Sequence, residues 1–343
     1  MERIGSKLEQ PLKLDQKAVI EVIHLSKTFG QKIKAVDDVF FSVYEGEIFG
    51  FLGPNGAGKT TTINMLTTQI VPSSGSALIA GYDIRKRPNE VRKRISVVLQ
   101  NNTADEELTG RENAQVIANL YGVPRAESSR LVEGILNLVE LGDAADRLVR
   151  GYSGGMRRRL EIAIGLISRP KILFLDEPTL GLDTQTREAI WAYVKTLRDK
   201  YSTTVFLTTH LMEEADRICD RIAIIDRGKI VKIGTPAEIK RVVGNDVIEF
   251  TLDSESDEVT RAVAEYVGAK VERTGEDYRV KVDKGEEAIP SIIELLASKG
   301  YLVKKVSLSK PSLSEAYLEL TGRAFREADQ EAVQTARMIS LFS

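Results

Sequence analysis

The stretch Gly53-Pro-Asn-Gly-Ala-Gly-Lys-Thr60 constrains the fold of this chain more than any other part of the sequence. It follows residues 38–52, which are rich in the β-branched and aromatic side chains of strands, and the pattern turns helical from Thr60 onward. A glycine-rich turn between a strand and a helix gathers backbone N–H groups at the positive end of the helix dipole. The sequence therefore predicts an anion site, and the most suitable anion is a phosphate group.

The spacing of this loop assigns a role to each of its parts, because it matches the pattern G-x-x-x-x-G-K-[ST]. Its glycines let backbone N–H groups surround a β-phosphate, Lys59 reaches the β- and γ-phosphates, and the Thr60 hydroxyl is a ligand for Mg²⁺. The glycine order differs from the G-x-G-x-x-G of dinucleotide sites, so a nucleoside triphosphate is expected. The residues predicted to bind it here are Gly53, Pro54, Asn55, Gly56, Ala57, Gly58, Lys59, Thr60 and Thr61.

Two later apolar runs read as buried strands of the same sheet. They are "KILFLDEP", residues 171–178, and "TTVFLTTH", residues 203–210, and a helical stretch over residues 185–200 separates them. This alternation predicts an α/β fold with parallel strands. The carboxyl ends of parallel strands line the ligand crevice of such sheets, so polar residues at these ends are candidates for the site.

Four polar residues stand at such strand ends. Asp176 would hold Mg²⁺ and Glu177 would polarise the water that attacks the γ-phosphate. His210 would contact the γ-phosphate, and Gln100, which ends "ISVVLQ", would orient water or complete the Mg²⁺ shell. The predicted catalytic residues are therefore Glu177, His210 and Gln100, and the predicted metal ligands are Thr60, Gln100 and Asp176.

The stretch "RGYSGGMRRRLEIA" places Ser153-Gly154-Gly155 at the start of a helix. Read locally, the serine is either a simple N-cap or part of an anion site built on the helix N-terminus. The arginines that follow, Arg157 to Arg159, are expected to face solvent, acidic neighbours or a partner. The rest of the chain has to decide between the two interpretations of the serine.

Composition excludes several classes of function. Forty-eight basic and fifty acidic residues give a net charge of −2, so no overall field attracts nucleic acid or acidic lipid. The chain has one cysteine, Cys219, expected in the core, and two histidines, which excludes a disulfide framework and a Cys/His metal cluster. No apolar segment has the length of a signal peptide core or a membrane span. A cytosolic setting is expected.

The pattern along the chain divides it into a larger part with the predicted nucleotide site and a smaller α+β part. Strands and helices after residue 245 follow the order β-α-β-β-α-β of a ferredoxin-like domain, and "PSLSEAYLELTG" reads as a closing helix. The sheet of the first part is expected to carry an antiparallel β subdomain and an inserted helical subdomain. The predicted divisions are an N-terminal extension 1–17, a nucleotide-binding domain 18–240 with helical residues about 101–165, an accessory domain 245–322 and a tail 323–343.

The order of these motifs closely resembles the ATP-binding cassette (ABC) ATPase family over about residues 18–240. The resemblance implies that Ser153, Gly154 and Gly155 form the cassette signature, which faces ATP held by another copy. It also implies that Asp183, in Gly181-Leu-Asp183, lies in the loop that crosses the dimer interface, and that Phe29 stacks on adenine. The signature departs from the commonest Leu-Ser-Gly-Gly-Gln, because Met156 replaces the glutamine.

Tyr-Ser-Gly-Gly-Met followed by arginines, together with "PSLSEAYLELTGR", resembles the branch of daunorubicin-resistance exporter ATPases. That branch works with separate ABC-2 type membrane subunits. The resemblance implies an ATPase that converts ATP and water to ADP and phosphate, dimerises with itself or a paralogous cassette, and lies on the cytoplasmic face of the membrane through its permease. Export of a drug, lipid or other hydrophobic compound is expected, and no nucleic acid. The alternative is a soluble ABC ATPase that acts on nucleic acid or ribosomes.

Overall fold

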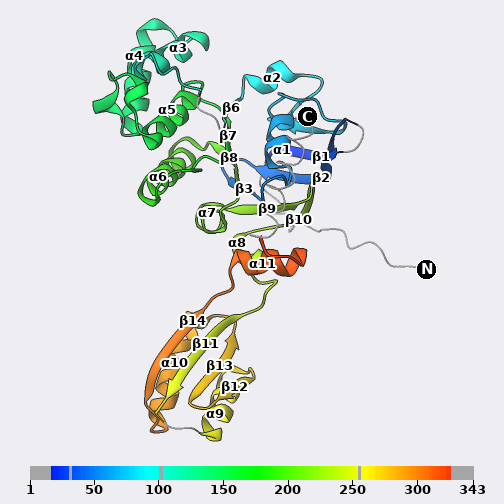
Figure 1. Cartoon of the computed structure of the whole chain (residues 1–343), viewed down its shortest axis with the longest axis vertical. Coiled ribbons are helices and arrows are strands. Elements are labelled where there is room, and N and C mark those ends of the chain that lie inside the picture. Colours follow the sequence, from blue (N-terminus) through cyan, green and yellow to red (C-terminus); the bar gives the residue numbers. More distant parts are fainter. Residues whose placement is uncertain (1–16, 31–32, 100–102, 254–255, 326–343) are drawn as a thin grey trace, which may run out of the picture. The chain divides into compact units, whose positions relative to one another are not determined.

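The computed structural model describes residues 17–30, 33–99, 103–253 and 256–325 (Figure 1). The chain divides into two compact units. The described residues up to Pro236, with Phe325, belong to the first unit, and Ala237–Ala324 forms the second. Across the described residues, no helix combines the length and apolar character needed to cross a membrane.

Within the described part of the first unit, six strands form the central sheet in the order β10-β9-β3-β8-β7-β6. Strands β9, β3, β8, β7 and β6 run parallel to one another, and β10 pairs antiparallel with β9. Every residue of β3, β7 and β8 is buried, which explains their unbroken apolar runs. The strands are β3 Ile48–Leu52, β6 Ile95–Val98, β7 Ile172–Asp176, β8 Thr204–Thr209, β9 Arg221–Asp226 and β10 Lys229–Gly234.

A second, antiparallel sheet packs against the first, in the order β2-β1-β4-β5 among the described residues. Phe41 of β2 stacks on Phe49 of β3, with ring centroids 5.6 Å apart, and Phe206 of β8 lies 6.1 Å from Phe41. These rings are fully buried and join the two sheets into one core. The strands are β1 Ala18–Phe29, β2 Ile33–Tyr44, β4 Ser74–Ile79 and β5 Tyr82–Asp83.

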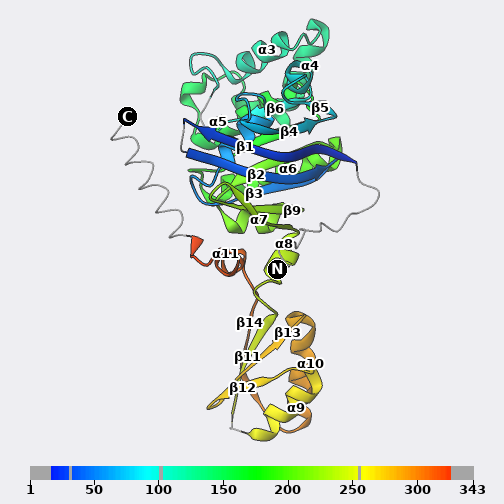
Figure 2. The same cartoon turned by 90° about the vertical axis from the view of Figure 1, so that its right-hand side faces the viewer.

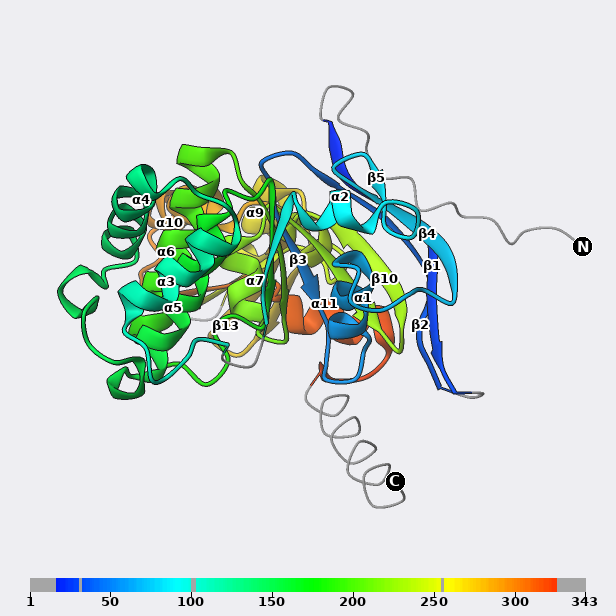
Figure 3. The same cartoon turned by 90° about the horizontal axis from the view of Figure 1, so that it is seen from above.

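The helices of the first unit lie at both sides of the parallel sheet. Figures 1 and 3 show α3, α4 and α5 together on one side and α1 on the other. The predicted helical block is confirmed in its type, and two 3-10 turns, Gly142–Ala144 and Val149–Gly151, separate α4 from α5. The helices are α1 Lys59–Leu66, α2 Pro88–Arg92, α3 Gly110–Leu120, α4 Arg125–Leu138, α5 Gly154–Ile167, α6 Thr184–Tyr201, α7 Met212–Ile218 and α8 Pro236–Lys240, which crosses the unit boundary.

The second unit has the predicted β-α-β-β-α-β order, and its described strands pair antiparallel in the order β12-β13-β11-β14. Helices α9 and α10 cover one face of this sheet (Figure 2), and the core includes a stacked pair, Phe250 and Tyr278, with centroids 5.1 Å apart. Its elements are β11 Asp246–Leu252, α9 Asp257–Val267, β12 Val271–Thr274, β13 Asp277–Val282, α10 Gly285–Ser298, β14 Val303–Ser309 and α11 Leu313–Thr321.

Candidate functional site

The glycine-rich loop joins β3 to α1, as the sequence predicts, and its glycines are required by space and backbone angle. Gly58 precedes the helix with φ +105°, a conformation that side chains rarely adopt, and a Cβ there would lie 2.4 Å from the Ala35 carbonyl oxygen. A Cβ on Gly53 would lie 2.4 Å from the carbonyl oxygen of Ile225. The loop therefore packs directly on backbone of β2 and β9.

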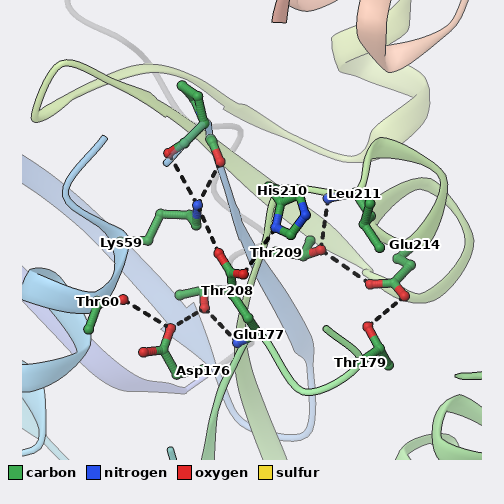
Figure 4. A network of polar contacts seen from close by, with 12 residues as sticks. Lys59, Thr60, Asp176, Glu177, Thr179, Thr208, Thr209, His210, Leu211 and Glu214 are labelled. Carbon is green, nitrogen blue, oxygen red and sulfur yellow. Dashed lines mark hydrogen bonds and ion pairs between the residues drawn. The ribbon is translucent and has the colours of Figure 1, made fainter. Parts of the chain in front are cut away.

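Lys59 is the first residue of α1, and its side chain is buried at 4% exposure. Its ammonium donates to the carbonyl oxygens of Gly53, at 2.7 Å, and Pro54, at 3.2 Å. It also lies 3.1 Å from Oε1 of Glu177, which follows β7 (Figure 4). The loop cation and the predicted catalytic carboxylate are therefore direct neighbours.

Asp176 ends β7 and faces the first turn of α1. Its Oδ1 accepts hydrogen bonds from Thr208 Oγ1 at 2.5 Å and from Thr60 Oγ1 at 3.4 Å (Figure 4). A carboxylate and a hydroxyl thus converge, and oxygen atoms are the ligands that Mg²⁺ prefers. The donor set fits Mg²⁺, which commonly binds to one or two protein oxygens together with substrate phosphates.

Glu177 is held from several sides. Its N–H donates to Thr208 Oγ1 at 3.0 Å, and its Oε2 lies 3.0 Å from His210 Nδ1 at the end of β8. Burial on its own raises the pKa of this carboxyl, but the His210 hydrogen bond and the Lys59 charge outweigh it, so the pKa is lowered. Glu177 is therefore ionised at neutral pH, as a base for water activation must be.

The other residues predicted to bind nucleotide differ in how closely they approach this centre. Asn55 and Thr61 are half-buried, Gly56 is exposed with φ +73°, and Ala57 is buried. Phe29 ends β1 with a ring that is 44% exposed, and the Lys27 ammonium lies 5.1 Å from the ring centroid. The exposed ring is open to a flat partner.

The Ser153 corner begins α5. Ser153 is exposed and caps the helix, since its Oγ accepts the Met156 N–H at 3.3 Å. Gly154 is exposed, whereas a Cβ on Gly155 would lie 2.5 Å from Thr186 Cγ2. Helix α5 lies apart from α1, with strands of the parallel sheet between them (Figures 1 and 3). The structure therefore brings the glycine-rich loop together with Asp176, Glu177 and His210 but keeps the helix of this corner away from α1.

Asp183 caps helix α6 and is exposed. Its carboxylate accepts the Thr186 N–H at 3.0 Å and the Thr186 hydroxyl at 2.6 Å. Thr186 therefore lies beside both Asp183, which caps α6, and Gly155 of the Ser153 corner. Gln100 lies outside the described residues.

Comparison with known proteins agrees with this geometry. A family model described as ABC transporter matches residues 36–180, and one described as the C-terminal domain of DrrA1-3-like ATP-binding proteins matches residues 234–321. The daunorubicin/doxorubicin resistance ATP-binding protein DrrA of Streptomyces peucetius is 41% identical over 308 residues, which cover 87% of this chain and 92% of that protein. This chain belongs to the ATP-binding cassette ATPase family. ATP hydrolysis is its activity, and the predicted family and fold are confirmed.

Two further proteins resemble this cassette. The Nod factor export ATP-binding protein I of Ralstonia nicotianae is 36% identical over 310 residues, which cover 90% of this chain and 95% of that protein. A solved dimeric structure of an ATP-binding cassette in a post-hydrolysis state, bound to ADP and Pi, is 25% identical with a TM-score of 0.58. It covers 63% of this chain and 98% of its own. The matched part of this chain therefore has the fold of an ATP-binding cassette.

The three arginines of this cassette's α5 each lie beside an acidic residue, and one of the three is buried. Arg157 pairs with Glu106, and Arg159 lies 3.3 Å from Glu140, so both meet acidic neighbours as predicted. Arg158 also meets an acidic neighbour, Glu161 at 2.9 Å, but it does so in the interior, where it is only 5% exposed. The middle residue of the run points inward because a helix turns about 100° per residue. Cys219 is buried, as predicted.

Sequence reasoning missed two side chains beside the residues that it predicted to be catalytic. Thr208 bonds both Asp176 and the N–H of Glu177. Glu214 of α7 is buried, and it accepts hydrogen bonds from Thr179 at 2.6 Å and from Thr209 at 3.2 Å (Figure 4). The available signals were the paired threonines at the end of a fully buried strand and an acid four residues after the histidine.

Proposed function

We propose that this cassette is the ATP-hydrolysing subunit of an exporter for a drug, lipid or other hydrophobic compound. The names of its relatives support this, since they describe daunorubicin and doxorubicin resistance and Nod factor export. The match to them extends through the second unit, which aligns with the C-terminal domain of DrrA-like proteins. An ABC-2 type membrane subunit would supply the path across the bilayer and hold the cassette on the cytoplasmic face.

One observation carries the mechanism: the carboxylate of Glu177 lies between Lys59 and His210. In hydrolysis, the backbone N–H groups of the loop and the Lys59 ammonium bind the β- and γ-phosphates. Glu177 accepts a proton from the attacking water, and His210 orients Glu177 and contacts the γ-phosphate. Phe29 offers its exposed ring to adenine.

Mg²⁺ would be held by Thr60 and Asp176, whose oxygens converge, with Gln100 as a further predicted ligand. When bound, the ion neutralises charge on the β- and γ-phosphates. Thr208 keeps Asp176 oriented toward the α1 turn through its hydroxyl. The protein therefore contributes a preset pair of oxygen ligands and leaves the rest of the shell to phosphates and water.

A dimer would complete each site. The exposed Ser153 and Gly154 lie on a helix that is separate from α1, so they suit ATP held by another copy, either of this chain or of a paralogous cassette. Asp183 would lie in the loop that crosses between the two copies. A related cassette has been solved as a dimer with ADP and Pi. ATP would then close the dimer, and hydrolysis would reopen it.

The test is to replace Glu177 with Gln in the full chain and to add ATP. We expect ATP to convert this variant from monomer to a stable dimer in light scattering, and Ser153→Arg in the same background to prevent dimerisation. Tagged wild-type chain should also copurify with a polytopic membrane protein from detergent-solubilised membranes. A Glu177→Gln variant that stays monomeric with ATP, or recovery of the chain with ribosomes or nucleic acid instead of a membrane protein, would contradict the proposal.

A further inference from the structure

Arg158 makes an unusual set of contacts for a residue in a run of arginines. From Nε it donates to the Pro178 carbonyl oxygen at 2.8 Å, and from one terminal nitrogen to the Asp176 carbonyl oxygen at 3.1 Å. The other terminal nitrogen donates to the Leu99 carbonyl oxygen at 2.5 Å and to the Glu161 carboxylate at 2.9 Å. One buried cation thus joins α5 to the ends of β6 and β7.

Two of these carbonyls flank Glu177. The peptide group between Asp176 and Glu177 is held at both ends, since Arg158 binds its carbonyl and Thr208 Oγ1 accepts its N–H. Glu177 itself has φ +46°, a left-handed conformation that is unfavourable for a non-glycine residue and persists only when the surroundings impose it. Arg158 belongs to those surroundings because it binds the backbone carbonyl groups on both sides of Glu177.

The geometry of the guanidinium explains why an arginine is needed. Its planar fork presents donors in several fixed directions, so it can satisfy three carbonyls and a carboxylate at once. A lysine at the same position carries its three donors on one atom and cannot span carbonyls that lie on different sides of the fork. Arg158→Lys therefore keeps the positive charge beside Glu161 but releases part of the backbone.

Glu161 extends the connection. Its Oε1 accepts the N–H of Thr103 at 2.6 Å, while its Oε2 pairs with Arg158. Leu99 and Thr103 stand on either side of residues 100–102, so both flanks of that segment are attached to the same ion pair. The pair is fixed from the α5 side because Arg158 and Glu161 are one turn apart on one helix.

We propose that Arg158 is a positioning residue for hydrolysis, which couples helix α5 to the peptide groups around Glu177. Helix α5 begins at the Ser153 corner, so a shift of this corner on meeting the partner's ATP would pass through Arg158 to the Glu177 of the same chain. Each chain would thereby align its own Glu177 only when the Ser153 corner of that chain contacts the ATP held by the partner. The inference rests on the proposed roles of Glu177 and of the Ser153 corner.

The first test compares Arg158→Lys with Arg159→Lys, a matched control whose arginine contacts Val139 O and Glu140 near the surface. We expect Arg158→Lys to lower kcat for ATP about tenfold to a hundredfold, as misplacement of a reacting group does. The Kd for ATP should change less than about twofold, and Arg159→Lys should leave both quantities near wild type. A wild-type kcat, or a loss of affinity equal to the loss of kcat, would overturn the proposal.

Mixed dimers separate the two sites. In a dimer of Arg158→Lys with Glu177→Gln, the working Glu177 belongs to the Arg158→Lys chain, and we expect slow hydrolysis. When both substitutions are in one chain and the other is wild type, the working Glu177 has its own Arg158, and hydrolysis should be several-fold faster. Equal or reversed rates would overturn the proposal. Failure of the Glu177→Gln chain to dimerise at all would instead refute the proposed function.

Glu161→Gln covers the case in which Arg158→Lys does not fold. Glutamine keeps an oxygen for the Thr103 N–H but removes the counter-charge that orients the fork. We expect a several-fold lower kcat with unchanged Kd for ATP. An unchanged kcat in this variant would count against the proposal by itself.

Discussion

The central sheet of the first unit and the sheet of the second unit use their strand ends in opposite ways. In the first unit β3, β7 and β8 run parallel, so their carboxyl ends meet at one edge, where the glycine-rich loop, Asp176, Glu177 and His210 follow. In the second unit each strand runs antiparallel to its neighbours, so successive ends fall at opposite edges. Direction of pairing thus decides where polar side chains can gather.

The burial patterns carry the same lesson. Strand β7 is buried throughout, whereas β13 alternates between exposed and buried residues, because α9 and α10 cover one face of its sheet. A strand with both faces covered can present polar groups only at its ends, and a strand with one open face presents them along its length. The first unit therefore gathers its candidate site residues at one edge of its parallel sheet, and the second unit presents polar groups along the open face of its sheet.

The sharpest test of this comparison exchanges one carboxylate in each unit for its amide. Glu177→Gln should lower ATP hydrolysis about 10²–10⁴-fold, because it removes the proposed general base, while ATP binding is retained. Glu249→Gln changes an exposed carboxylate of β11 that pairs with Arg279 and should leave the rate within about twofold. Phosphate release and nucleotide titration measure both. A large rate loss from Glu249→Gln would show that chemistry is not confined to the first unit.

The next test asks whether the two cores unfold separately. Phe206→Ala and Phe250→Ala each remove a buried ring and should each cost about 3–5 kcal/mol in the unfolding free energy of their own unit. The same free-energy loss lowers Tm more in a small domain, so Phe250→Ala should give the larger shift. Calorimetry of the full chain resolves the transitions. If both substitutions moved one shared transition, the two units would not be independent.

The smallest expected effect is a shift of a pH profile. In its proposed role as base Glu177 acts when ionised, so we expect kcat/KM to hold above its pKa and to fall as the pH drops through it. Because the His210 hydrogen bond helps to lower this pKa, His210→Ala should move the acid limb of kcat/KM to higher pH as well as lowering the rate. His24→Ala, which changes an exposed histidine paired with Asp38, is the control. An acid limb that stays in place would mean that His210 does not hold the charged form of Glu177.

The sequence was enough for the parts of the site that lie in continuous motifs. The loop from Gly53 to Thr60 is local, and its glycine pattern follows from backbone angles that only a few positions require. The strand ends became readable through this loop, because carboxylates after a buried strand, as at Asp176 and Glu177, would by themselves suggest only a solvated turn. The order of the second unit was clear from its alternating strands and helices.

Arg158 was not readable in this way. Its partners are mostly backbone carbonyls, at Leu99, Asp176 and Pro178, and a carbonyl oxygen is the same for every residue type. Those carbonyls come from positions 18 to 59 residues away in the sequence, so no local pattern connects them. The sequence left solvent, acidic neighbours and a partner open for all three arginines, so it did not single out Arg158 as the buried one.

The left-handed backbone at Glu177 has a consequence for the evolution of this chain. Glycine would adopt φ +46° at less cost, so a library of variants selected only for thermal tolerance should tend to accept glycine or asparagine at position 177 and lose turnover. A library selected for turnover should keep glutamate and accumulate compensating changes elsewhere. At position 177, the residue that gives the highest turnover is therefore different from the residue that gives the highest thermal stability.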